Sequence, residues 1–146
     1  MKTTKTTLTL MLASLATMLT ASLGAAPEPT TAIMYPVTAV TRDGKAIIKP
    51  GTWRADVREL IGVPQEHLTT NVWVYRRFHA SHPAADADGC DRLVIAFKDG
   101  YVSSLRMANA RAQAVIVARV NDGASEHVAL GTVPKVPPAT MVAKKD

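Results

Sequence analysis

The sequence predicts an α+β domain in which one short helix packs on a three-stranded antiparallel β-meander. Three observations support this fold. An apolar stripe with helical spacing lies near residue 55, three segments rich in β-branched and aromatic residues follow residue 70, and an Asp-Gly pair separates the last two segments. An N-terminal hairpin and a C-terminal helix are expected to extend the same fold.

The hairpin is expected before the helix. Residues 35–40 and 45–48 are apolar-rich segments, and Arg42-Asp43-Gly44 between them contains a tight-turn signal. This pattern favours two short antiparallel strands.

The helix is expected to begin after Gly51, with Thr52 as its N-cap. Gly62 suits the position just past the helix end, and Pro64 prevents continuation. Four apolar residues at helical spacing form the stripe that must be buried, namely Trp53, Val57, Leu60 and Ile61. The helix is therefore about ten residues long and depends on packing for its stability.

The meander is expected to use residues 71–79, 92–97 and 101–107, with Asp99-Gly100 as the turn before the last strand. Alternation places Leu93, Ile95 and Phe97 on one face of the second strand. In the first strand it separates two sets, Trp73, Tyr75 and Arg77 against Val72, Val74 and Phe78. Residues 80–89 between the first two strands have no apolar pattern and are predicted to be a mobile loop.

The segment after the meander, residues 108–120, carries two opposing signals. Its alanines favour a helix, whereas Val115-Ile116-Val117 favours a strand. We expect a helix over residues 108–118, and the strand alternative stays open.

Targeting features divide the rest of the chain. Residues 1–24 resemble an export signal, with Lys2 and Lys5 before an apolar core that is shorter than the roughly 20 residues needed to span a bilayer. We expect cleavage after Gly24 or Ala25, with an uncleaved anchor as the alternative. The expected organisation is a signal peptide over 1–24, a disordered linker over 25–34, the domain over 35–120 and a disordered tail over 121–146.

Charge and cysteine content limit the function classes. The formal net charge is +5, of which the two signal lysines contribute two, so the remainder lacks the strong basic character of a nucleic-acid binder. A single cysteine, Cys90, excludes a disulfide within the chain. No cysteine lies near residues 20–30 to carry a lipid. We therefore expect a soluble periplasmic protein after cleavage.

Four blocks in fixed order carry a resemblance to a known family. They are Gly51-Thr52-Trp53-x-x-x-Val57-x-x-x-Ile61-Gly62-x-Pro64, Trp73-x-Tyr75, Leu93-x-Ile95-x-Phe97 and Asp99-Gly100-x-Val102. Over residues 45–107 this order resembles the SmpA/OmlA domain of the BamE-like outer-membrane lipoproteins. The resemblance implies a small accessory module of the β-barrel assembly machinery that contacts partner proteins and anionic phospholipid. It also departs from the family, because the lipobox cysteine and the first helix are missing and Thr52-Trp53 is inverted.

Most residues of the four blocks are architectural, so they support the fold more than the function. We expect structural roles for Gly51, Val57, Ile61, Gly62, Pro64, Ile95, Phe97 and Gly100. No nucleophile motif and no glycine-rich phosphate loop occurs, so the expected protein is a non-enzymatic adaptor without a cofactor.

The candidate residues for binding a protein partner or anionic headgroups are Trp73, Tyr75, Arg77, Arg106 and Arg111. Core packing of the aromatic pair and a solvated face for the arginines are the alternatives. A second function class is a periplasmic metal-binding protein that uses residues 79–91. Its weak candidate ligands are His79, His82 and Cys90. A third class is an inhibitor similar to β-lactamase inhibitory proteins, which contain two such units where this chain has one.

Overall fold

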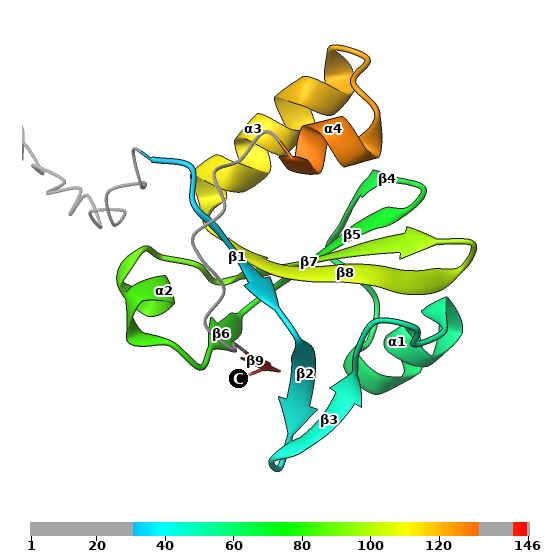
Figure 1. The fold of residues 1–146 in the computed structure, drawn as a ribbon, viewed down its shortest axis with the longest axis vertical. Helices are drawn as coiled ribbons and strands as arrows, with labels where there is room; N and C mark the ends of the chain where they lie inside the picture. Colours follow the sequence, from blue (N-terminus) through cyan, green and yellow to red (C-terminus); the bar gives the residue numbers. More distant parts are fainter. Residues whose placement is uncertain (1–30, 132–141, 146) are drawn as a thin grey trace, which may run out of the picture.

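The computed structural model describes residues 31–131 and 142–145 (Figure 1). The expected signal peptide, most of the linker and part of the tail lie outside these residues. The described elements are, in order, β1 (Met34–Val37), β2 (Ala39–Arg42), β3 (Lys45–Ile48), α1 (Arg54–Ile61), β4 (Glu66–Thr69), β5 (Val72–Arg76), β6 (Phe78–Ala80), α2 (Pro83–Ala87), β7 (Arg92–Lys98), β8 (Tyr101–Ala108), α3 (Ala110–Asn121), α4 (Glu126–Gly131) and β9 (Val142–Lys145).

The class is α+β, with two sheets and several helices. One sheet has five strands in the order β1-β8-β7-β5-β4, and the other has four in the order β3-β2-β9-β6. The expected three-stranded meander is therefore too small. Strands β5, β7 and β8 do pair antiparallel. They are the centre of the larger sheet, to which β1 and β4 add the two edges.

Strand pairings link the two sheets into a closed circuit. β1 and β2 are separated only by Thr38, and β5 and β6 only by Arg77, so each pair is one bent strand that passes from one sheet to the other. Around the circuit, β1 pairs with β8, β8 with β7 and β7 with β5, while β6 pairs with β9 and β9 with β2. The domain is thus a small barrel-like unit.

Two apolar clusters fill the spaces on either side of the five-stranded sheet. The larger lies inside the circuit and beneath α1, and includes Tyr75, Phe78, Leu93 and Ile95. The smaller lies between the opposite face of the sheet and α3 and α4, and includes Val74 and other apolar residues. Figure 1 shows α3 and α4 on one side of this sheet and α1 on the other. The central strands are therefore buried on both faces.

The bend at Arg77 corrects the expected strand over residues 71–79. Arg77 has a φ of +64°, which interrupts extended pairing. The interruption changes the phase of the side chains, so Phe78 packs in the same cluster as Trp73 and Tyr75 instead of opposing them.

Both predicted Asp-Gly turns adopt the positive φ angles of a type I′ hairpin. The angles are +52° and +75° at Asp43 and Gly44, and +52° and +83° at Asp99 and Gly100. The first turn joins β2 to β3, which confirms the turn of the N-terminal hairpin. The expected first strand was too long, however, because residues 34–37 form β1 and pair with β8 in the other sheet.

Helix α1 is shorter than expected at its start. Its N-cap position is Trp53, and the hydroxyl of Thr52 instead accepts a hydrogen bond from the Lys49 amide at 3.0 Å. The end is as predicted, since Gly62 has a φ of +88° and its amide donates to the Arg58 carbonyl at 2.9 Å.

The expected mobile loop and disordered tail both contain regular structure. Residues 83–87 form α2, residues 126–131 form α4 and residues 142–145 form β9. The linker boundary is also earlier than expected, because Met34 is buried in β1. The helix expected after the meander is present as α3, over residues 110–121. Among the described residues, no helix has the length and apolarity to cross a bilayer.

Candidate functional site

The most exposed aromatic surface is formed by Trp53 and Tyr101. These side chains are 44% and 51% exposed, and their ring centroids lie 4.9 Å apart at an interplanar angle of 59°. They belong to segments that pair as an isolated β-bridge. We call Trp53 and Tyr101 the aromatic surface. It combines large apolar area with a fixed backbone, as expected for an interaction anchor.

Backbone hydrogen bonds hold the aromatic surface in place. The Arg54 amide donates to the Gly100 carbonyl at 2.9 Å, and the Val102 amide donates to the Thr52 carbonyl at 2.9 Å. The Trp53 ring lies directly over Gly100, where a β-carbon would be only 2.2 Å from Trp53 Cζ3. Glycine is therefore required at this turn for two reasons. It adopts a positive φ without strain, and it leaves room for the Trp53 ring.

Beneath this surface, Arg54 connects α1 to the core. Its guanidinium carbon lies 4.8 Å from the centroid of Phe97 and 5.4 Å from that of Trp73, in cation–π geometry. Its Nη2 also donates to Asn71 Oδ1 at 2.8 Å. The exposed ring of Trp53 thus adjoins a residue that is fixed by three contacts.

The two aromatic residues proposed from the sequence as a platform, Trp73 and Tyr75, lie in the core. They are 5% and 1% exposed. Trp73 packs edge-on against Phe97 with centroids 4.6 Å apart, and the Tyr75 hydroxyl donates to the Gly62 carbonyl at 3.1 Å. Burial raises the pKa of Tyr75, so its hydroxyl stays a donor. Both residues fix α1 to the sheet and are not available to a partner.

The three candidate arginines occupy different environments. Arg77 is exposed at the bend between β5 and β6, and Arg111 is exposed in the first turn of α3. Arg106 is half-buried, and its Nη1 donates to the Leu130 carbonyl of α4 at 2.7 Å. Burial lowers the pKa of Arg106 from its ordinary value. Arg106 therefore attaches α4 to the sheet, whereas Arg77 and Arg111 have no such structural contact to a helix among the hydrogen bonds described above.

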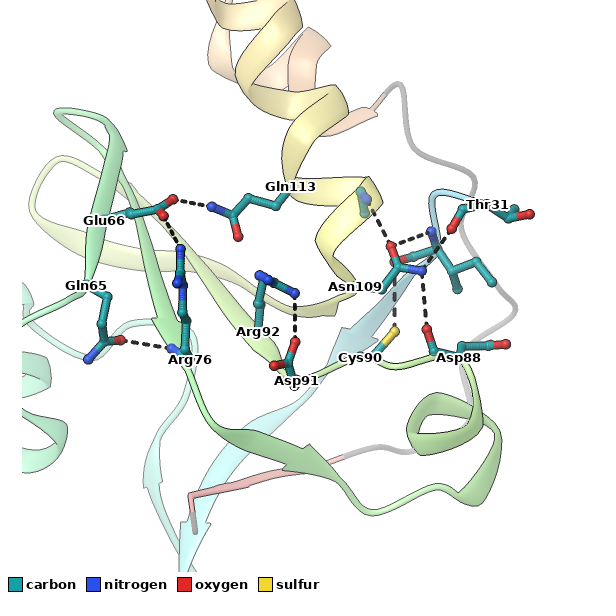
Figure 2. Close-up of polar contacts among 12 residues, drawn as sticks. Thr31, Gln65, Glu66, Arg76, Asp88, Cys90, Asp91, Arg92, Asn109 and Gln113 are labelled. Atoms are coloured by element: carbon teal, nitrogen blue, oxygen red, sulfur yellow. Dashed lines mark hydrogen bonds and ion pairs between the residues drawn. The ribbon is translucent and has the colours of Figure 1, made fainter. Parts of the chain in front are cut away.

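A polar cluster that the sequence did not predict lies between α3 and the strand ends (Figure 2). Glu66 accepts hydrogen bonds from both Arg76 and Gln113, and Arg92 Nη1 donates to Asp91 Oδ1 at 2.8 Å. The arginines are cross-strand neighbours on β5 and β7. They line, with one side of α3, an open groove of about 450 Å³. Within the described residues, Arg92 Nε and Gln113 Oε1 are buried without a hydrogen-bond partner.

Asn109 is the centre of a second group of hydrogen bonds, which Figure 2 also shows. It is fully buried, and its Oδ1 accepts from the Ala112 amide at 2.9 Å as the N-cap of α3 and from the Ile33 amide at 3.3 Å. Its Nδ2 donates to the Thr31 carbonyl at 2.9 Å and to the Asp88 carbonyl at 3.2 Å. These bonds join three distant segments, so Asn109 has an architectural role.

The candidate metal ligands do not converge. His82 is the N-cap of α2 and accepts from the Ala84 amide at 3.3 Å, and His79 Nδ1 lies 3.5 Å from Asp86 Oδ1. Cys90 is 2% exposed, and burial, followed by the charges of nearby aspartates, raises its pKa to about 12. In the part of the chain that the structure describes, no group of three His, Cys, Asp or Glu residues is arranged to hold a metal ion.

Comparisons with protein families, with curated proteins and with solved structures found no match for this chain.

Proposed function

We propose that this protein is a non-enzymatic interaction module of the bacterial cell envelope that binds a protein partner through the aromatic surface. The observation that carries the proposal is the exposure of Trp53 and Tyr101 on two segments that are hydrogen-bonded to each other. Trp and Tyr dominate binding energy at protein interfaces because they bury a large area with little loss of side-chain entropy.

The cellular compartment is part of the proposal. It is supported by the export-signal pattern of residues 1–24 and by the BamE-like order of motifs over residues 45–107. The expected product is a chain that begins near Ala25 and is recovered in the soluble periplasmic fraction. Recovery in the membrane pellet after carbonate washing, with Met1 retained, would overturn this part.

Site-specific photo-crosslinking in the native envelope tests the partner proposal. A crosslinker that replaces Tyr101 should give one discrete protein adduct, and Trp53→Ala should weaken its formation by about 30-fold, as expected for loss of an interface hot spot worth about 2 kcal/mol. The matched control is a crosslinker at Val128, an apolar residue on α4 that is 56% exposed. The same adducts at both positions, or none at Tyr101, would contradict the proposal.

Anionic phospholipid is the second ligand that the BamE-like resemblance implies. Of the three candidate arginines, Arg77 and Arg111 remain exposed for this role, whereas Arg106 is occupied by Leu130. Replacing Arg77 and Arg111 with Glu should abolish salt-sensitive binding to phosphatidylglycerol vesicles and leave the melting temperature unchanged. Lys45→Glu together with Lys98→Glu, at exposed positions on β3 and β7, makes the same change of four charge units and so controls for net charge. Equal binding by the double variant and the wild type would exclude an arginine-based lipid site.

A further inference from the structure

Strand β9 completes the closed circuit of strands. It lies between β2 and β6, pairing parallel with the first and antiparallel with the second. In the four-stranded sheet, β2 and β6 meet only through β9. Without β9, therefore, the facing edges of β2 and β6 would form an open slot whose two sides both present unpaired backbone groups.

The contacts of β9 show which kind of peptide segment fits this slot. Ala143 is fully buried and lies opposite Val40 on one side and Ala80 on the other. The Ser81 amide donates to the Val142 carbonyl at 2.9 Å, and Ser81 Oγ accepts from the Val142 amide at 3.1 Å. These contacts require an extended backbone with a small residue at the buried position.

A cation is recognised two residues after the small residue. Lys145 Nζ donates to the Ile61 carbonyl at 3.2 Å. This carbonyl belongs to the C-terminal end of α1, where the helix dipole is negative. Asp43 also lines the adjoining cavity of about 130 Å³, together with both lysines of β9 and Arg42. The slot therefore favours an extended segment of the pattern small-x-Lys or small-x-Arg.

The attachment of β9 is weak for a central strand. Ala143 is its one fully buried side chain, Val142 is half-buried, and Lys144 and Lys145 are exposed. Ten residues, 132–141, lie between α4 and β9, a length that reaches up to about 35 Å. Hydrophobic burial therefore holds β9 much less firmly than it holds β5 and β7, the central strands of the five-stranded sheet.

We propose that the slot between β2 and β6 is a strand-acceptor site, which β9 occupies reversibly and which an extended small-x-Lys/Arg segment of a partner protein enters in its place. This is binding by β-strand addition, in which backbone bonds give affinity and alternate side chains give specificity. The site shares no residue with the aromatic surface, so it goes beyond the function proposed above. Each can be tested without the other.

The test uses the full chain with Ala143→Arg, which places a long charged side chain at a fully buried position and so expels β9. The probe is a fluorescent peptide with the sequence of residues 141–146, followed by anisotropy. A tethered strand competes at an effective concentration on the order of millimolar, so the peptide should bind the variant at least about tenfold more tightly than the wild type. The same peptide with Arg in place of Ala143 should bind neither protein. Equal binding to both proteins, or no binding to a folded variant, would overturn the proposal.

Hydrogen exchange on the wild-type chain keeps the proposal testable if Ala143→Arg does not fold. The amides of residues 142–145 should exchange at least about 100-fold faster than those of β7 and β8, because β9 opens without global unfolding. Equal protection of β9 and the central strands would show that β9 is a permanent part of the core and would exclude the acceptor site.

Discussion

At the scale of single residues, Gly44 and Gly100 differ in why a glycine is needed. At both positions the backbone has a positive φ, but only at Gly100 would a β-carbon also clash with another side chain. Both follow an aspartate in a type I′ turn, with φ of +75° and +83°. No atom lies within 4 Å of a β-carbon at Gly44, whereas the Trp53 ring occupies that position at Gly100. Gly44→Ala should therefore cost only the backbone penalty of about 1–2 kcal/mol. Gly100→Ala should cost clearly more, or displace the Trp53 ring.

Urea unfolding and near-ultraviolet circular dichroism check this prediction. In a Trp53→Ala background the two glycine substitutions should become nearly equal in cost, because the steric part disappears. If Gly100→Ala remains more costly than Gly44→Ala in that background, the aromatic surface does not depend on this glycine.

Cys90 allows a second prediction at the same scale. Its pKa rises from an ordinary 9.0 to about 12 in the folded chain, so at pH 8 the folded protein contains far less thiolate than the unfolded chain. Maleimide labelling of the native protein at pH 8 should be at least about 100-fold slower than in urea, as a pKa difference of this size requires. With iodoacetamide in place of maleimide, the native rate should keep rising from about pH 9 to about pH 10.5, where labelling in urea levels off. A native rate that levels off together with the rate in urea would show an accessible thiol.

Among the elements, α3 depends on one cap. Asn109→Ala removes the acceptor for the Ala112 amide and the two donors to the Thr31 and Asp88 carbonyls. The loss of a cap and of buried hydrogen bonds should lower the free energy of unfolding by roughly 3 kcal/mol. Asn121→Ala, at the exposed end of the same helix, should change it by less than about 0.5 kcal/mol. Similar effects of the two substitutions in urea unfolding would contradict the role assigned to Asn109.

Several elements were predictable because local chemistry decides them. The two Asp-Gly turns and the end of α1 at Gly62 are examples, since few other residues tolerate those φ angles. The bend at Arg77 was not predictable, because an arginine at a φ of +64° has no sequence signature. Strand β9 was missed for another reason. Four residues with one buried alanine carry no alternation that distinguishes them from a solvated tail.

The candidate site was harder to predict than the elements. Trp53 fits a helical apolar stripe, but it lies at the cap and so turns outward against Tyr101. Trp73 and Tyr75 fit an exposed face of a small sheet, yet α1 and the second sheet cover that face. Exposure depends on elements far away in the sequence, and here on strands and helices that were not expected.

For the molecule as a whole, the interior of the circuit should dominate stability. Phe97 is 4% exposed and contacts both Trp73 and Arg54. Phe97→Ala should cost roughly 3–5 kcal/mol, a large part of the stability of a domain of this size. Val128→Ala on α4 should cost less than about 0.5 kcal/mol. Thermal unfolding that ranks the two substitutions equally would place the main core elsewhere.

The position of β9 also sets the order in which the molecule can be completed during synthesis. Its partner residues in β2 precede it by about a hundred positions, so this pairing is among the most non-local in the chain and is expected to form late. Among the described strands, all the others emerge from the ribosome before residues 142–145 do. A nascent chain can therefore assemble the five-stranded sheet while its second sheet still lacks a central strand. Chains that stall or are cleaved before residue 142 would carry two unpaired edges, a recognisable mark for chaperones and proteases.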